Sequence, residues 1–368
     1  MGDDIGPCTL AFFISPHGFG HAARACAVME AFRKLQPDSH FEVFTSIPIW
    51  FFQDSLTAPF RYHPVHTDVG LVQKNAFEID IDRTVQHLNA FLPFDPHLIH
   101  DLAKVVTESQ CRQILCDIAP LGIAVARASA VPSVLIENFT WDWVYRELSS
   151  ANALLTTHCR YLQRMFSAAD VRIQAEPVCQ AHPDSTPVAP VSRRARTPAE
   201  QIRKDLGIAP DQKIVLISSG GVPYHFAFLD RLQEFPEIVF VVAGGSREIE
   251  RRENVVLLPQ QSEYFHPDLI GAGDVVVAKA GYSTIAEVYA AGVPFGFINR
   301  MENPESASLA DYAEHELSGL AIREPDFNSG RWLEQLPALL ALPRRPPGEP
   351  NGADQIAAFV AEALEETD

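Results

Sequence analysis

The chain has 368 residues, of which 47% are hydrophobic and 21% charged, and its formal net charge is −18. This length exceeds what one hydrophobic core usually organises, so we expect two domains. The negative charge repels phosphate, which argues against general binding to nucleic acid or to anionic membranes. A local pocket for one phosphate-containing ligand remains compatible with this charge.

The first residues, MGDDIGPC, lack the charged and apolar regions of a signal peptide, and no apolar run is long enough to span a membrane. The six cysteines form no CxxC pair, and the spacing of Cys111 and Cys116 suits zinc poorly. We therefore expect a cytoplasmic protein with reduced cysteines and no transmembrane segment.

The first half of the chain alternates short apolar runs with helical patterns. The pattern predicts strands at residues 10–15, 41–46, 112–117 and 132–138, and helices at residues 21–35, 95–109 and 121–130. Continuous apolar strands between helices are typical of a parallel sheet covered on both faces. This predicts a doubly wound, Rossmann-like α/β domain over residues 1–175.

Residues 176–200 are rich in Pro, Ser and Arg and have no apolar period, which indicates a linker. Five strand candidates follow, at residues 213–221, 237–245, 254–260, 274–281 and 294–300. They predict a second doubly wound domain over residues 201–345, followed by a tail and an amphipathic helix over 346–368. Two such domains facing each other would form a central cleft at the carboxyl ends of both sheets, where open α/β sheets bind ligands.

The loop at the end of the strand DVVVAKAG combines several phosphate-binding features. Lys279 ends the strand, Gly281 supplies a turn, and Ser283 and Thr284 start a helix. Backbone amides, hydroxyls and one cation at a helix N-terminus together suit a diphosphate. In the alternative interpretation, Thr284 is simply the N-cap of the helix.

Two other features of this half also have two interpretations. Gly220 and Gly221 directly follow a strand, where glycines either let the backbone approach a phosphate or form a plain turn. Glu287 lies one turn into the helix. Its carboxylate would accept two hydrogen bonds from a ribose diol, or it would act only on the helix dipole.

The segment LLPQQSEYFHPDLIGAGDVVVAKAGYSTIAEVYAAGVP resembles the nucleotide-sugar box of GT-B glycosyltransferases. It looks like the box of plant small-molecule glucosyltransferases and of the lipid II-forming N-acetylglucosaminyltransferase. The shared frame contains Pro259-Gln260, Gly281, Glu287 and the AGVP segment. The resemblance implies that Gln260 belongs to the nucleotide site and that Glu287 binds ribose.

The same resemblance implies further contacts with the donor. Lys279, which stands where the plant enzymes have histidine, and Thr284 would contact phosphate. Ser283 replaces an asparagine of the plant box, a departure that concerns sugar choice more than nucleotide binding. Relatives place donor-sugar contacts after the last strand, and the candidates in this sequence are Arg300, Glu302 and Glu305.

The first half resembles the glycosyltransferase-like N-terminal domain of plant L-arabinokinases and its free-standing bacterial relatives. The matching pieces are GFGHAAR, DVGLVQKNAFEID, CDIAPLGIAVARA and ENFTWDWVY, in this order. The 368 residues contain no counterpart of the kinase part of the plant proteins, so we expect no sugar-kinase activity.

In inverting GT-B enzymes, a histidine of the first loop takes the proton of the acceptor, and by position this is His21. Gly20 would keep that loop narrow so that the sugar diphosphate can reach it, which makes Gly20 a candidate diphosphate-site residue, and His17 is a candidate acceptor contact. Asp117 would orient His21, or it would cap the next helix. Alternatively, His21 would be a residue that caps its own helix.

Three weaker candidates lie in the same half. Arg24 would steady a phosphate or a carboxylate, or form a surface ion pair. Trp141 and Trp143 would stack on an acceptor ring or pack beneath the cleft. Asp80 and Asp82 imitate a metal-binding DxD motif, but GT-B enzymes seldom need one, so we expect neither a metal nor another cofactor.

These features together predict an inverting glycosyltransferase. A nucleotide diphosphate sugar, UDP-linked by expectation, would donate to an unidentified small-molecule, glycan or other acceptor. The alternatives are a UDP-sugar 2-epimerase of the same fold and a non-catalytic nucleotide-sugar sensor.

Overall fold

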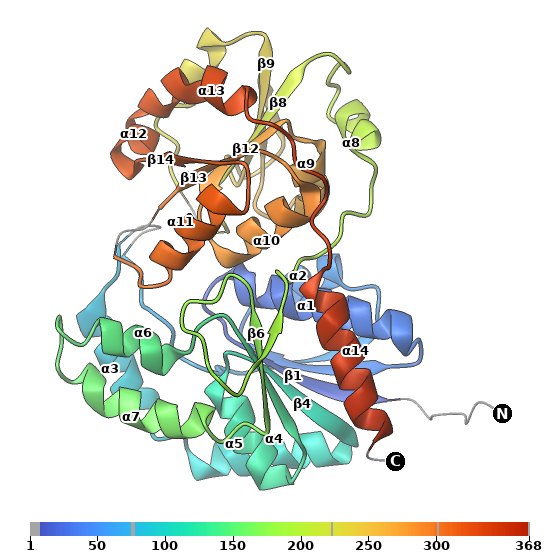
Figure 1. Cartoon of the computed structure of the whole chain (residues 1–368), viewed down its shortest axis with the longest axis vertical. Coiled ribbons are helices and arrows are strands. Elements are labelled where there is room, and N and C mark those ends of the chain that lie inside the picture. Colours follow the sequence, from blue (N-terminus) through green and yellow to red (C-terminus); the bar gives the residue numbers. More distant parts are fainter. Residues whose placement is uncertain (1–7, 75–77, 222–223, 300–301, 367–368) are drawn as a thin grey trace. The chain divides into compact units, whose positions relative to one another are not determined.

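The computed structural model describes residues 8–74, 78–221, 224–299 and 302–366. The chain forms two compact units (Figure 1). Unit 1 comprises Met1–Gln73, Ile79–Ser192 and Pro350–Asp368, and unit 2 comprises Lys74–Glu78 and Arg193–Glu349. In the described part of the chain, no helix has both the length and the apolar character needed to cross a membrane.

Unit 1 contains a seven-stranded parallel sheet in the order β3-β2-β1-β4-β5-β6-β7. Its strands are β1 (Thr9–Ile14), β2 (His40–Thr45), β3 (Phe60–Pro64), β4 (Cys111–Asp117), β5 (Ser133–Glu137), β6 (Val171–Ala175) and β7 (Thr186–Val188). The order reverses between β1 and β4, so the carboxyl ends of these two neighbours form the switch point at which such sheets bind ligands.

Helices cover both faces of this sheet because alternate residues of each apolar strand point to opposite faces. On one face, Phe12 and Phe41 pack together, and Phe32 of α1 lies against Phe41. Helix α14 lies beside α1 (Figure 1). The helices of unit 1 are α1 (Phe19–Leu35), α2 (Ile49–Ser55), α3 (Ile81–Phe91), α4 (Pro96–Glu108), α5 (Pro120–Ser129), α6 (Trp141–Glu147), α7 (Leu155–Phe166) and α14 (Gly352–Glu365).

Unit 2 contains a second seven-stranded sheet in the order β10-β11-β9-β8-β12-β13-β14, in which only the β10–β11 pair is antiparallel. Its strands are β8 (Lys213–Ser218), β9 (Ile238–Ala243), β10 (Glu250–Arg252), β11 (Val255–Leu258), β12 (Val275–Lys279), β13 (Phe295–Ile298) and β14 (Gly319–Ile322). Here the order reverses between β8 and β12, which places the switch point at their carboxyl ends.

Two apolar clusters cover the two faces of the second sheet, one with Leu216 and Ile285, the other with Ile217 and Trp332. The helices of unit 2 are α8 (Ala199–Asp205), α9 (His266–Ala272), α10 (Tyr282–Ala291), α11 (Ser306–His315), α12 (Glu324–Ser329) and α13 (Leu336–Leu340), with 3-10 turns at Leu229–Glu234 and Arg331–Gln335. The predicted α/β class with two doubly wound units is confirmed.

The division of the chain differs from the predicted ranges in two places. Strand β7 lies inside the predicted linker, where it extends the sheet by pairing with β6. The predicted carboxyl-terminal tail ends in α14, which belongs to unit 1. The cause is Asn351, which caps α14 and exchanges two hydrogen bonds with the backbone of Ser192.

Candidate active site and nucleotide site

His21 and Asp117 meet at the switch point of unit 1. His21 lies in the first turn of α1, and Asp117 is the last residue of β4, in register with Ile14 of β1. His21 Nδ1 lies 2.8 Å from Asp117 Oδ1. Arg24 Nη2 lies 3.4 Å from the same nitrogen, but the contact with Asp117 is much shorter, and a carboxylate only accepts hydrogen bonds. This favours the tautomer with the proton on Nδ1, in which Nε2 is the basic nitrogen.

The local geometry excludes two of the alternative interpretations. Helix α1 begins at Phe19 with Gly18 as its N-cap, so His21 does not cap it, and Gly20 lies within the first turn. Gly18, with φ of 77°, is the glycine that the turn requires. The N-cap of α5 is Ala119, so Asp117 does not cap that helix either.

Arg24 completes this cluster as a buried partner of Asp117. Its Nε donates to Asp117 Oδ2 and its Nη2 to Oδ1, both at 2.7 Å, and its Nη1 donates to Asn138 at 2.8 Å. Burial alone would raise the pKa of Asp117, but the Arg24 charge and the hydrogen bonds hold it below its ordinary value. Arg24 therefore steadies a carboxylate, one of the three possibilities that the sequence left open, and Asp117 is ionised when it orients His21.

The three predicted acceptor contacts, His17, Trp141 and Trp143, all lie in unit 1. Trp141 is 1% exposed, packs against Tyr145 and meets the ring of His17 edge-on. Its indole therefore packs beneath the site and offers no open face to an acceptor. Trp143 is partly buried in the same core.

His17 Nδ1 accepts a 3.4 Å hydrogen bond from the backbone of Leu71, so the ring is held against the loop that follows β3.

Asp68 is a buried carboxyl group to which the sequence assigned no role. It is 5% exposed, and its Oδ2 accepts a 2.9 Å hydrogen bond from Trp141 Nε1. Burial raises the pKa of Asp68 to about 6, although the nearby His21 acts in the opposite direction. The only sequence signal was its place in the DVGLVQKNAFEID piece of the resemblance.

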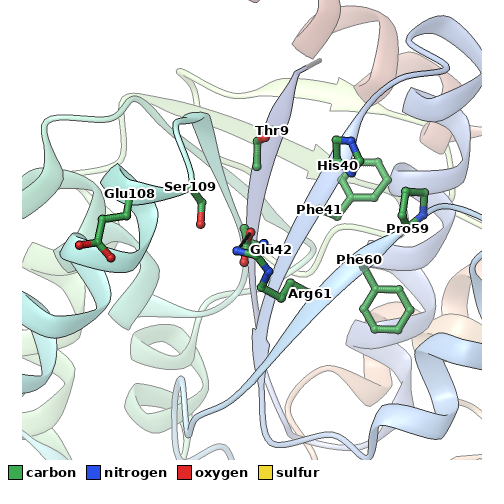
Figure 2. A pocket seen from close by; sticks show the side chains of 9 residues that line it. All are labelled: Thr9, His40, Phe41, Glu42, Pro59, Phe60, Arg61, Glu108 and Ser109. Atoms are coloured by element: carbon green, nitrogen blue, oxygen red, sulfur yellow. Dashed lines mark ion pairs between the residues drawn. The ribbon is translucent and has the colours of Figure 1, made fainter. Parts of the chain in front are cut away.

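A hollow of about 430 Å³ lies at the opposite, amino-terminal edge of this sheet (Figure 2). Two carboxylates line it: Glu42 pairs with Arg61 at 3.2 Å and with His63 at 2.5 Å, and Glu108 pairs with Lys104 at 3.6 Å. The hollow is therefore separate from the His21–Asp117 pair and contributes nothing to that site.

In unit 2, the glycine turn after β8 lies next to Lys279 at the end of β12. A side chain placed on Gly220 would lie 3.4 Å from Lys279 Cε. Gly220 and Gly221 have φ values of 71° and 82°, which favour glycine. Gln260 donates its side-chain Nε2 to the Gly221 carbonyl. The structure thus brings these four predicted residues together at the second switch point.

Helix α10 starts beside them with Gly281 as its N-cap. No side chain caps this helix, and a side chain on Gly281 would meet nothing within 4 Å. Thr284 is buried, and Ser283 is partly exposed. Thr284 is therefore not the N-cap. Open space lies in front of the helix N-terminus, whose partial positive charge favours an anion.

Glu287 has partners that the sequence did not predict. It is 3% exposed, and its Oε1 accepts from Arg193 Nε at 3.0 Å and Nη2 at 2.8 Å. Its Oε2 lies 2.8 Å from His266 Nδ1. Burial alone would raise the pKa of Glu287, but Arg193 and His266 hold it below its ordinary value. The guanidinium of Arg193 also lies 4.9 Å from the ring centre of Phe265.

The remaining candidates are less informative. Arg300 lies outside the described residues. Glu302 is exposed, and Glu305 is buried at the N-cap position of α11, where it accepts from Asn303 Nδ2 at 3.0 Å. Asp80 caps α3, and Asp82 accepts from Asn152. Among the described residues, no group of three or more His, Cys, Asp or Glu side chains is arranged to hold a metal ion.

Two doubly wound units with these switch points form the GT-B fold, and comparison with solved structures confirms it. The glycosyltransferase SnogD from Streptomyces nogalater matches 98% of this chain and 95% of its own with a TM-score of 0.57 at 16% identity. The glycosyltransferase VinC, solved in complex with DTDP, matches 97% of this chain and 95% of its own with a TM-score of 0.56 at 14% identity. At these identities the likeness shows the fold.

Sequence relatives confirm both predicted resemblances, whereas no protein-family model matches the chain. L-arabinokinase from Arabidopsis thaliana is 27% identical over 374 residues, which cover 97% of this chain and 34% of the plant protein. The UDP-N-acetylglucosamine–N-acetylmuramyl-(pentapeptide) pyrophosphoryl-undecaprenol N-acetylglucosamine transferase of Halalkalibacterium halodurans is 29% identical over 169 residues, or 40% of this chain and 44% of that enzyme. The chain thus spans about a third of the first relative and less than half of the second.

Proposed function

We propose that the protein is an inverting glycosyltransferase that moves a sugar from a nucleotide diphosphate sugar to an acceptor hydroxyl. The observation that carries the proposal is the 2.8 Å contact between His21 Nδ1 and Asp117 at the switch point of unit 1. It leaves Nε2 as a proton acceptor in a fixed orientation, which is what a general base requires.

In the proposed reaction, His21 Nε2 takes the proton of the acceptor hydroxyl, and the acceptor oxygen forms a bond to the anomeric carbon of the sugar. The bond from that carbon to the diphosphate breaks, and its electron pair leaves with the diphosphate oxygen. Attack from the side opposite the leaving group inverts the configuration. The imidazolium is held by Asp117, and the proton later passes to water.

The diphosphate is proposed to bind at the second switch point. The N-terminus of α10, the glycine turn and the ammonium group of Lys279 would stabilise the departing negative charge. Because these groups supply positive charge directly, we propose that transfer requires no divalent metal and no other cofactor.

We further propose UDP as the nucleotide and Glu287 as its ribose ligand. The relative from Halalkalibacterium halodurans supports UDP through its printed substrate, whereas VinC was solved with DTDP, so both nucleotides belong in the test. The ribose role requires that Arg193 or His266 releases a carboxylate lone pair of Glu287, since both oxygens are engaged.

That engagement also favours a second candidate, a protein that binds a nucleotide sugar without transferring it. Glu287 is 3% exposed and locked by two partners, which suits a structural role better than ligand exchange. A UDP-sugar 2-epimerase would instead convert UDP-N-acetylglucosamine into its 2-epimer without any acceptor.

A thermal-shift screen with UDP, TDP, GDP and their sugar conjugates tests the proposal. A ligand at 100 times its dissociation constant stabilises the folded protein by roughly 2.7 kcal/mol, which is visible as a rise in Tm. Lys279→Met should abolish the rise for the diphosphates, and Lys213→Met, at the other end of the same sheet, should not. The stabilising UDP-sugar is then followed by chromatography: transfer or hydrolysis supports the transferase, an epimer the epimerase, and binding alone the sensor.

We also propose a cytoplasmic location. The support is that all six cysteines are free thiols in the structure, as expected in a reducing compartment.

A further inference from the structure

Three of the four sequence pieces of the first-half resemblance meet around one buried carboxyl group. Asp68 comes from the DVGLVQKNAFEID piece, its partner Trp141 from ENFTWDWVY, and His21, whose ring centre lies 6.4 Å from that of Trp141, from GFGHAAR. The proposed function assigns roles to His21 and Asp117 but none to Asp68.

We propose that Asp68 is a positioning residue that acts through His21: it supplies the negative charge that the imidazole needs when it takes the acceptor proton. This inference rests on the proposed function, because it assigns a charge balance to that base. Asp68 itself touches neither acceptor nor donor in the proposal.

The first argument is that Asp68 cannot move away from its position. The segment from Thr67 to Leu71 is tied to the structure on both sides: the Thr67 hydroxyl donates to the Ile14 carbonyl and the Tyr145 hydroxyl to the Gly70 carbonyl, both at 2.7 Å. A side chain on Gly70 would lie 2.7 Å from the ring of His17, so this segment packs directly against the loop that leads into α1 and His21. Trp141 Nε1 fixes the carboxylate itself.

The second argument is the charge balance of the buried cluster. Arg24 is 1% exposed and pairs with Asp117 through two hydrogen bonds, so these two charges cancel. Once His21 gains a proton, the cluster would carry one uncompensated positive charge in a site of low dielectric. An ionised Asp68 changes this: the cluster then has a net charge of −1 before proton uptake and zero after it.

The third argument is that three neighbouring groups, Tyr145, Glu137 and His17, do not offer this charge. Tyr145, on α6, is a buried phenol whose pKa burial and Asp68 raise well above its ordinary value, so it stays neutral. Glu137, at the end of β5, is paired with Arg172 at 3.3 Å and with Gln174 at 2.8 Å. His17 can contribute only positive charge. Asp68 accepts a hydrogen bond from Trp141 on Oδ2, and hydrogen bonding from Trp141 and from the Ser15 side chain favours its ionised form.

The test follows the Asp68 carboxyl carbon by NMR in the full chain labelled with carbon-13 aspartate. The signal is assigned by its loss in Asp68→Asn. In the wild type, its titration midpoint should lie near pH 6, and His21→Gln should raise the midpoint by about one pH unit, because the imidazolium that favours ionised Asp68 is gone. His21→Asn serves as a second variant if the Gln protein is unfolded.

His17→Gln is the matched control, because it removes an imidazole that touches the same indole. It should leave the Asp68 midpoint unchanged. A midpoint near the ordinary value of about 4, an equal shift in the His17 and His21 variants, or no shift in the His21 variants would each overturn the proposal.

A second measurement uses turnover of the UDP-sugar identified by the thermal-shift screen, with water or sugar as acceptor. Asp68→Asn should lower turnover about 10-fold at pH 7, and the two rates should converge below pH 6, where wild-type Asp68 is itself neutral. A structural role would instead lower turnover equally at all pH values. If the wild type turns over no donor, the proposed function fails, and the NMR coupling still decides whether Asp68 and His21 share charge.

Discussion

At the scale of single residues, His21→Ala separates chemistry from folding. Removing a positioned general base should slow the chemical step by about 10²–10⁴-fold. Asp117 keeps its two hydrogen bonds to Arg24, so the fold and the UDP affinity should change little. Turnover, calorimetry with UDP and Tm are to be measured on the same preparation. Transfer at a near-wild-type rate would end the general-base proposal.

His17→Ala is the comparison for that variant. His17 is held by a 3.4 Å hydrogen bond to the loop after β3 and lies beside the base site. Its loss should act mainly on the apparent KM for the acceptor and leave kcat within a few-fold of the wild type. An equal loss of kcat in both variants would mean that the whole loop, and not His21 alone, carries the chemistry.

Asp68→Asn should change how stability depends on pH. The folded-state pKa of Asp68, about 6, lies above the unfolded value, so the folded state holds the proton more tightly. Ionisation of Asp68 therefore lowers the free energy of unfolding as pH rises from about 4 to about 6, by roughly 2–4 kcal/mol in total. The amide of Asn can still accept from Trp141. Urea unfolding at pH 4 to 8 should show this loss in the wild type and a flatter curve in the variant.

At the scale of elements, two ion pairs that share Glu287 of α10 connect this helix to Arg193 and to His266 of α9. Arg193→Met leaves Glu287 buried with, among the described residues, His266 as its remaining ion-pair partner, which should destabilise unit 2 by roughly 3–5 kcal/mol. If Glu287 binds ribose, the same change frees a carboxylate oxygen and should tighten UDP binding. Urea unfolding and calorimetry measure the two effects separately.

The neighbouring arginine supplies the control. Arg194 pairs with Glu349 at the surface, where side-chain exposures of 45% and 61% make the bridge worth less than about 1 kcal/mol. Arg194→Met should therefore change neither stability nor UDP affinity. Weaker UDP binding in Arg193→Met would assign the arginine itself to the nucleotide and contradict the competition between Arg193 and ribose.

At the scale of the whole molecule, α14 returns the carboxyl-terminal part of the chain to unit 1. Asn351 is 3% exposed, accepts from Ala353 N at 2.9 Å and bonds the Ser192 backbone. Asn351→Ala should cost roughly 1–3 kcal/mol. Hydrogen exchange should report the loss in α1 and α14, which pack together, and leave α10 protected. Equal loss of protection in both units would show that they unfold as one.

The proposed reaction as a whole should not depend on divalent metal. EDTA should leave turnover of the identified donor unchanged, because Lys279 and the α10 N-terminus supply the positive charge. Full loss of turnover in EDTA, restored by Mg²⁺ or Mn²⁺, would contradict this. It would also make Asp80 a candidate metal ligand again, although its carboxylate caps α3 by accepting a hydrogen bond from the Arg83 amide at 3.0 Å.

Most of the fold could be predicted from the sequence because it depends on patterns local to the chain. The runs LAFFIS and DVVVAKAG read as buried strands and form β1 and β12. The site was predictable only where a resemblance or a strand end marked a residue, as for His21, Asp117 and Lys279. Strand β7 was missed because it has only three residues, the middle one of which is Pro187, and so carries no periodic signal.

By itself, the sequence determined the alternation of strands and helices, the two doubly wound units and the loops that follow their strands, because apolar periodicity is a property of neighbouring residues. The tertiary structure alone decided the partners of the buried charges. Arg24 and Asp117 are 93 residues apart, and Arg193 and Glu287 are 94 apart. Such pairs form only when strand order brings distant segments together, and burial then requires each charge to find a partner.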